Sequence, residues 1–123
     1  MQERKGYRKL EVYEKSYKAA LAVYRMTEGF PKEELYGIQG QMRRASLSIP
    51  LNIAEGYAKR ESQQEFKRFL MMAMGSSNEM SVLLDFAKDV GYLKDSQHTK
   101  AAKEYDEISK MLNSLVQAVR KQV

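Results

Sequence analysis

Apolar residues recur at steps of three and four along most of the chain, which is the spacing of one face of an α-helix. The pattern predicts four helices: from about Arg8 to Glu28, from Pro31 to about Arg60, from Ser62 to Gly91, and from Asp95 or Ser96 onward. The connections between them are short, so consecutive helices should be antiparallel neighbours. The sequence therefore predicts an all-α fold, an antiparallel up-down-up-down four-helix bundle, as a single domain over residues 1–123.

Local signals mark several helix ends. Pro31 is a favoured first helical residue, and Ser62 with Glu65 forms a capping box. Gly29 and Gly91 are plausible helix stops. Inside the second predicted helix, Pro50 removes one backbone donor, and we expect a kink there.

Each helix carries an apolar stripe that can form the core. On the first helix the stripe comprises Val12, Ser16, Ala19, Val23 and Met26, and a neighbouring row holds Tyr13, Tyr17, Ala20 and Tyr24. The stripe of the second comprises Met42, Ala45, Ile49 and Ile53, and that of the third Phe66, Phe69, Ala73, Ser76, Met80, Leu83, Ala87 and Val90. We interpret the tyrosine row as core with its hydroxyls at the rim; a platform on which bases stack is the alternative.

The second and third helices are apolar on two sides, whereas the fourth has one stripe and a polar back. A second apolar side needs a second partner, because monomers seldom expose a large apolar patch. The sequence therefore predicts a homo-oligomer. Its expected interface residues are Tyr36, Leu47, Leu51, Met71, Gly75, Val82 and Phe86.

Several motifs resemble those of the 23S rRNA intervening-sequence protein family. They include Arg43-Arg44-Ala45, Ser48-Ile49-Pro50, Asn52-Ile53-Ala54-Glu55-Gly56-Tyr57, Glu34-Leu35-Tyr36-Gly37 and Gly91-Tyr92-Leu93. Gly40 departs from the pattern, since relatives usually carry a small polar residue there. The resemblance implies a helical bundle similar to the accessory protein of diversity-generating retroelements, assembly as a pentameric ring, and association with RNA or DNA and with nucleic-acid enzymes.

Charge favours polyanionic partners mildly. The 21 Lys and Arg residues exceed the 16 Asp and Glu residues, for a net charge of +5. Between Arg43 and Arg68 there are six basic and three acidic residues, whereas between Phe69 and Glu107 there are four basic and seven acidic ones. We expect the basic residues to gather at one end of the bundle and to bind nucleic acid: Arg43, Arg44, Lys59, Arg60, Lys67 and Arg68.

No catalytic, metal or cofactor site is predicted. The chain has no cysteine and one histidine, His98, which we interpret as a solvated residue at a helix start. Asn52 and Glu55 are interpreted as structural polar residues: Asn52 at the core edge, fixing register, and Glu55 paired with an arginine or a backbone donor. The charged N-terminus and the lack of a long apolar run predict a cytoplasmic protein without a membrane span.

Two functions remain open at this point. The leading hypothesis is a non-enzymatic, homo-oligomeric protein that binds RNA or DNA through basic residues. The alternative is a protein-interaction scaffold whose second apolar face binds a different partner protein. An enzyme is the third and least supported possibility, because no constellation of residues favours one.

Overall fold

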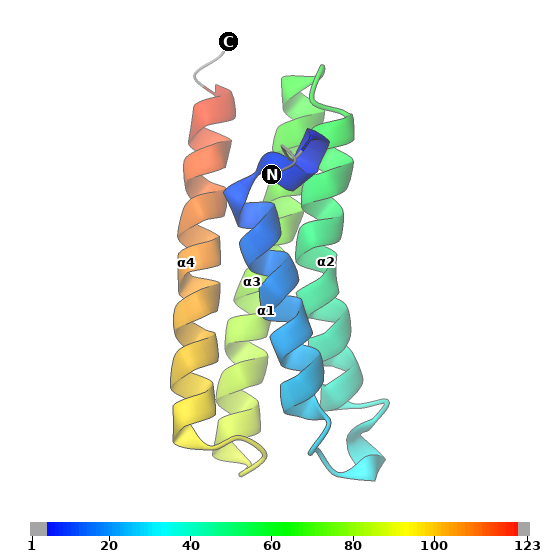
Figure 1. Cartoon of the computed structure of the whole chain (residues 1–123), viewed down its shortest axis with the longest axis vertical. Helices are drawn as coiled ribbons and strands as arrows, with labels where there is room; N and C mark the ends of the chain where they lie inside the picture. Colours follow the sequence, from blue (N-terminus) through cyan, green and yellow to red (C-terminus); the bar gives the residue numbers. More distant parts are fainter. Residues whose placement is uncertain (1–4, 121–123) are drawn as a thin grey trace.

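The computed structural model describes residues 5–120, which are all-helical and contain no strand. Four long helices, α1 (Glu11–Thr27), α2 (Ile38–Ala58), α3 (Gln63–Asp89) and α4 (Asp95–Arg120), pack side by side (Figure 1). Short 3₁₀ helices, η1 (Gly6–Lys9) and η2 (Lys32–Glu34), precede α1 and α2. The predicted antiparallel four-helix bundle is confirmed. The predicted domain also includes residues 1–4 and 121–123, which lie outside the described residues.

Each helix contacts two others, in the cyclic order α1, α2, α3, α4. Within residues 5–120 the backbones of α1 and α3, and those of α2 and α4, do not approach each other closely, so these pairs lie diagonally across the bundle. Helices α1 and α3 run in the same direction, from the end that holds the α2–α3 connection to the end that holds the other two connections (Figure 1). The outward sides of α1 and α3 therefore face away from each other.

Two predicted helix starts are wrong. Leu10 is extended, with φ −76° and ψ 124°, so α1 begins at Glu11 and not at Arg8. Pro31 opens the 3₁₀ turn η2, and α2 begins only at Ile38, after Gly37 adopts φ −99° and ψ −123°. This turn brings the Leu35 carbonyl over α2, where a Cβ at position 40 would stand 2.9 Å from its oxygen. That approach explains the glycine at position 40.

Other local predictions hold. The Glu65 backbone N–H donates to Ser62 Oγ at 3.2 Å, so Ser62 caps α3. Gly91 has φ +87°, and the Tyr92 N–H donates to the Ala87 carbonyl at 2.8 Å, which is a glycine-dependent helix stop. Helix α2 continues through Pro50 as one helix, and the kink expected there stays a prediction.

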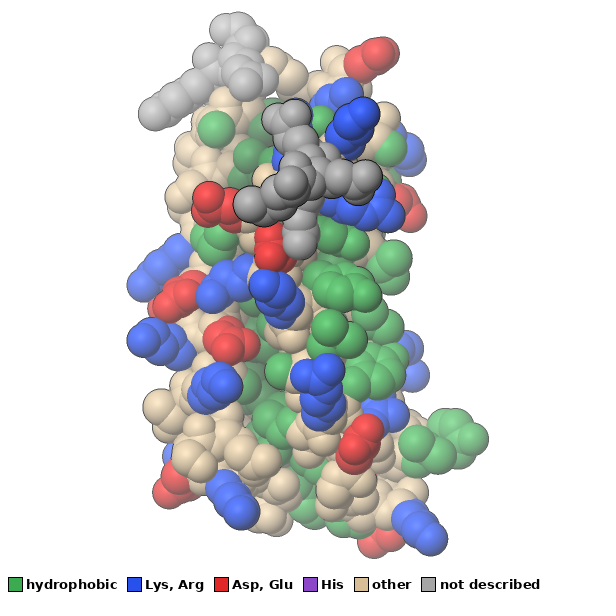
Figure 2. All heavy atoms as spheres, in the orientation of Figure 1, with side chains coloured by type: hydrophobic (Ala, Val, Ile, Leu, Met, Phe, Trp, Pro, Cys, Tyr) green, Lys and Arg blue, Asp and Glu red, His purple; other side chains and the backbone are tan. Residues whose placement is uncertain are grey.

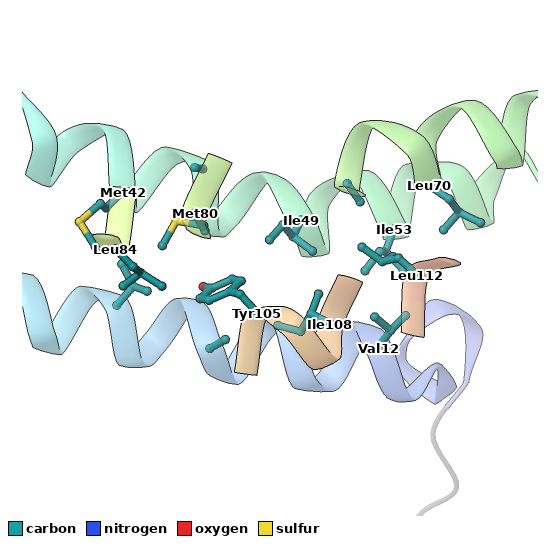
Figure 3. Packing of buried hydrophobic residues seen from close by; sticks show 14 of the residues in the cluster. Val12, Met42, Ile49, Ile53, Leu70, Met80, Leu84, Tyr105, Ile108 and Leu112 are labelled. Atoms are coloured by element: carbon teal, nitrogen blue, oxygen red, sulfur yellow. The ribbon is translucent and has the colours of Figure 1, made fainter. Parts of the chain in front are cut away.

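The core lies along the bundle axis and draws side chains from all four helices (Figure 3). The predicted α2 stripe is fully buried, as Met42, Ile49 and Ile53 each have no exposed surface. On α3 the buried row differs from the prediction: Ser77 and Leu84 are buried and Val90 is 46% exposed. The reason is α4, because Ser77 Oγ donates to the Tyr105 carbonyl at 3.1 Å and is 2.7 Å from Ser109 Oγ.

Helices α2 and α3 approach each other closely near the start of α3. A Cβ at Gly56 would stand 2.9 Å from Phe69 Cβ and 3.2 Å from Phe66 Cδ1. Such distances leave no room for a side chain, so position 56 requires glycine for packing. The motif residue Gly56 therefore has a structural explanation that involves no ligand.

Candidate nucleic-acid interface and assembly faces

Basic side chains from three segments gather at the end of the bundle that holds the α2–α3 connection. We call them the basic end: Lys9, Lys59, Arg60, Lys67, Arg68 and Arg120. Helix η1, the α2–α3 connection and the last turn of α4 all lie at this end (Figure 1), and Lys and Arg side chains crowd its α2 side in Figure 2. Lys9 Nζ lies 5.8 Å from the centre of the Tyr57 ring, which places η1 against α2. Folding thus joins cations that are distant in sequence.

Two aromatic rings hold cations in place there. Arg60 Cζ is 4.1 Å from the centre of the Tyr57 ring, and its Nη1 donates to the Tyr57 carbonyl at 3.0 Å. Lys59 Nζ and Arg68 Cζ lie 4.7 and 4.5 Å from the centre of the Phe69 ring. Cations that already rest on rings lose less side-chain freedom when they bind a phosphate.

Acidic residues offset part of this charge. Arg68 Nε donates to Glu65 Oε2 at 2.7 Å, and this hydrogen bond holds the pKa of the Glu65 carboxyl below its ordinary value. Glu61 is exposed in the same connection. Lys67 and Arg120 line a shallow depression of about 220 Å³ between the start of α3 and the end of α4. The basic end therefore has two parts, one on each side of α3.

Arg43 and Arg44 do not belong to the basic end, contrary to expectation. Arg44 lies 15 positions before Lys59, which corresponds to about 22 Å along the helix at about 1.5 Å per residue. Arg43 Nε donates to Thr27 Oγ1 and its Nη2 to the Tyr24 carbonyl, both at 3.0 Å. Its guanidinium also lies 4.5 Å from the centre of the Tyr24 ring. Arg43 thus caps the last turn of α1 and ties it to α2.

The expected interface residues of α2 and α3 are largely uncovered in the single chain. Leu51 is 61% exposed, Val82 67% and Phe86 57%, while Leu47 is half-buried. Tyr36, before α2, is 92% exposed. We define the α3 face as Met71, Gly75, Val82 and Phe86. Their burial in an oligomer stays a prediction.

Helix α1 adds a second apolar surface, which the sequence reasoning missed. Tyr17 is 47% and Tyr24 37% exposed, so the interpretation of this tyrosine row as core is wrong for both. Leu21 is 42% exposed beside them. Together with Ala20 and Leu47 these residues line a depression of about 170 Å³, which we call the α1–α2 groove. Figure 2 shows the strip of hydrophobic side chains along α1 and α2.

The adjacent core stripe explains why this surface was missed. Tyr13 and Ala20 of the same row are partly or fully buried, so the row straddles the edge of the core. Only the position of α2 decides which members are covered. Leu21 belongs to neither predicted row of the first helix. An apolar residue at this position was the sequence signal that could have indicated an exposed apolar surface on α1.

The other polar residues singled out from the sequence differ in their surroundings. Asn52 Nδ2 donates to the Ser48 carbonyl of its own helix at 2.8 Å, so no described contact gives it a role in register. Glu55 is exposed; together with the hydrogen-bonded Glu65, its charge raises the pKa of the Arg68 guanidinium, and its expected pairing with an arginine stays a prediction. His98 Nε2 lies 2.7 Å from Asp85 Oδ1, and its side chain is 17% exposed. His98 therefore links α4 to α3 and is not a solvated residue.

Within residues 5–120, no group of three or more His, Cys, Asp or Glu side chains is arranged to hold a metal ion. In the same range, none of the helices combines the length and the apolar character that crossing a membrane requires.

Comparison with known proteins places this geometry in context. A family model described as 23S rRNA-intervening sequence protein matches residues 8–114. The crystal structure of a protein of unknown function from the S23 ribosomal protein family of Bacteroides thetaiotaomicron is similar, with a TM-score of 0.78 and 24% sequence identity over 86% of this chain and 95% of that chain. At that identity the likeness shows the fold alone. No curated protein matches the chain.

Proposed function

The chain belongs to the family of 23S rRNA-intervening sequence proteins, and from this premise we propose that it is a non-enzymatic, homo-oligomeric protein that binds the phosphates of RNA or DNA. The basic end is the proposed binding surface, and a pentamer is the proposed assembly. The observation that supports the proposal is the convergence of Lys9, Arg60, Lys67 and Arg120 from three segments at one end of the bundle.

The chemistry of the basic end suits phosphate better than bases. Arginine forks and lysine ammonium groups bind phosphate oxygens, and the release of counterions drives the association. The Phe69 ring is buried, and cations cover both Phe69 and Tyr57. Neither ring is free to stack on a base, so binding should have little sequence preference.

Assembly would strengthen this binding. A ring of copies repeats the basic end around its axis, so several weak phosphate contacts act together. The exposed apolar residues of α1, α2 and α3 support self-association, because a surface of this kind is costly in water. Helix α4 has no large exposed hydrophobic residue within the described chain, so it would face solvent.

A salt titration tests the binding proposal. The test variant replaces Lys59, Arg60, Lys67 and Arg68 with glutamine. A matched control replaces Lys88, Lys94, Lys100 and Lys103 with glutamine, which removes the same charge near the opposite end. Affinity for single-stranded RNA and duplex DNA is measured by fluorescence anisotropy from low to physiological salt.

The wild type and the control should bind alike, with affinity that falls steeply as salt rises. The test variant should bind weakly, and its slope of log K against log salt on duplex DNA should be shallower by about 3 to 4, roughly 0.9 for each phosphate that the variant no longer neutralises. Equal binding by all three proteins would show that the basic end does not bind the nucleic acid. No binding by the wild type at low salt would remove the binding proposal altogether.

The exposed α1–α2 groove favours a second candidate, a scaffold that binds a different protein. Light scattering at micromolar protein separates the two assemblies, because the scaffold alternative expects a monomer. If the wild type is an oligomer, replacing Leu47 and Val82 with aspartate should dissociate it while circular dichroism shows unchanged helix content. A clean wild-type monomer would favour the scaffold.

A further inference from the structure

Two separate apolar surfaces lie on opposite sides of the bundle. The α1–α2 groove is on the side of α1, and the α3 face is on the outward side of α3, which is diagonal to α1. Figure 1 shows α1 in front and α3 behind. In a symmetric dimer contact, a surface packs against the same surface of a second copy, so only one of the two surfaces is covered. In a head-to-tail contact, one surface packs against the other surface of the next copy, so both are covered.

The shapes of the two surfaces are complementary. The α1–α2 groove is a depression of about 170 Å³ lined by Tyr17, Ala20, Leu21, Tyr24 and Leu47. On the α3 face, Val82 and Phe86 are 67% and 57% exposed and lie one helical turn apart on the same side. A projecting pair of this kind fits a groove, whereas two grooves facing each other would leave a void.

The charges around the two surfaces are also complementary. Residues 17–47, which include the groove, carry five basic and three acidic residues, whereas residues 75–90, which include Val82 and Phe86, carry one basic and three acidic ones. Arg44 lies one turn from Leu47, and Glu79 lies one turn from Val82. Neither has an ion-pair partner within residues 5–120. Head-to-tail contact brings opposite charges together, and like faces would repel.

The α1–α2 groove and the Val82–Phe86 part of the α3 face lie toward the same end of the bundle. Tyr17–Tyr24 lies in the later part of α1, and Val82 and Phe86 lie in the last turns of α3. Because α1 and α3 run in the same direction, both parts lie toward the end that holds the α1–α2 and α3–α4 connections (Figure 1). A second copy turned about an axis parallel to the bundle would therefore present its α3 face near the level of the groove.

We infer that Val82 and Phe86 of one copy pack into the α1–α2 groove of a second copy, flanked by contacts between acidic residues of α3 and basic residues beside the groove. The inference rests on the homo-oligomer in the proposed function and identifies its contact. Phe86 is the central projecting side chain, and Leu21 is the exposed aliphatic residue of the groove that it meets.

Mixing two variants, each with one blocked surface, tests the pairing. Leu21→Asp blocks the groove and Phe86→Asp blocks the α3 face; both positions are exposed, so the single chain should keep its fold. Asn113→Asp, at an exposed position of α4, is the charge control. Each protein and the equimolar mixture are measured by light scattering and native mass spectrometry at the same micromolar concentration.

The control should keep the wild-type mass, and each blocked variant alone should be monomeric. The mixture should give a dimer with one copy of each variant, twice the monomer mass and nothing larger, because one intact groove and one intact α3 face remain in it. A mixture that stays monomeric would overturn the pairing. A self-associated Leu21→Asp or Phe86→Asp protein would also overturn it, since each variant retains one unblocked surface.

Circular dichroism checks that both variants remain helical, and Tyr17→Asp with Val82→Asp is a second pair if either unfolds. A monomeric wild type would instead contradict the homo-oligomer itself. The two failures are therefore distinguishable, because a wild-type oligomer whose blocked variants do not complement each other disproves only this contact.

Discussion

Replacing Arg43 with glutamine separates a structural from a ligand-binding role for this residue. Arg43 is half-buried and joins α2 to the last turn of α1 through Thr27 Oγ1 and the Tyr24 carbonyl. Glutamine is too short to make both hydrogen bonds and does not carry the charge. We expect the free energy of unfolding to fall while phosphate affinity of the folded protein stays the same.

The magnitude follows from the interactions that the substitution removes. A hydrogen bond from a charged donor contributes about 1.5–3 kcal/mol, and a guanidinium 4.5 Å from a ring centre about 0.5–1 kcal/mol near the surface. Water can replace the exposed bond to the Tyr24 carbonyl, and Thr27 Oγ1 keeps its own bond to the Val23 carbonyl at 2.8 Å. The expected decrease is therefore about 2 kcal/mol, or roughly 5–10 °C in Tm for a domain of this size.

Lys100→Gln is the matched control, because it removes the same charge at an exposed position of α4 where Lys100 has no ion-pair partner within residues 5–120. It should change the unfolding free energy by less than about 0.5 kcal/mol. Urea unfolding is followed by circular dichroism at one protein concentration, since assembly shifts apparent stability. Equal midpoints for the two variants would refute the structural role, and weaker RNA binding by folded Arg43→Gln would restore the binding role.

Further predictions concern packing, a buried hydroxyl and an ion pair. Gly56→Ala should lower the free energy of unfolding by about 1–3 kcal/mol in chemical denaturation, because the added Cβ would meet Phe69 Cβ at 2.9 Å; an unchanged midpoint would show that α3 can move away. Tyr105→Phe should leave stability unchanged or raise it by about 1 kcal/mol, because the Tyr105 hydroxyl is buried without a partner in the described chain; a clear decrease in the same assay would reveal one. Lys15→Gln should raise the pKa of Glu107 in an NMR titration, because the hydrogen bond from Lys15 lowers it. A carboxyl whose pKa is lowered in the folded state stabilises the fold above its ordinary pKa, and this contribution is lost as pH falls through the folded pKa. The free energy of unfolding of the variant should therefore decrease less between neutral and acid pH than that of the wild type. An unmoved Glu107 pKa would contradict this.

Several structural features followed from neighbouring residues alone. Ser62 with Glu65 marked the start of α3, and Gly91 marked its end, because a cap and a left-handed glycine depend on local backbone geometry. The spacing of the apolar residues also predicted the buried stripe of α2 correctly. The start of α2 was not, because Pro31 suits a 3₁₀ turn as well as an α-helix.

The composition of the candidate site was less predictable. The basic end includes Lys9 and Arg120, which lie 50 and 61 positions from Lys59 in the sequence and come near it only through packing of η1 and α4. Arg43 looked similar to Arg60 in the sequence. Its position near the opposite end follows from the length of α2, and its hydrogen bond with Thr27 follows from the place where α1 ends.

By itself, the sequence determined the four helices, their antiparallel order, the surplus of apolar positions on α3 and the family. Only the tertiary structure decided which of two adjacent rows on α3 is buried, since Ser76 and Ser77 fit heptad patterns equally well until Ser77 meets α4. It also decided that Tyr17 and Tyr24 remain exposed. The physical reason is that a periodic pattern reports the residues that share a side of a helix, whereas burial depends on the neighbour that covers that side.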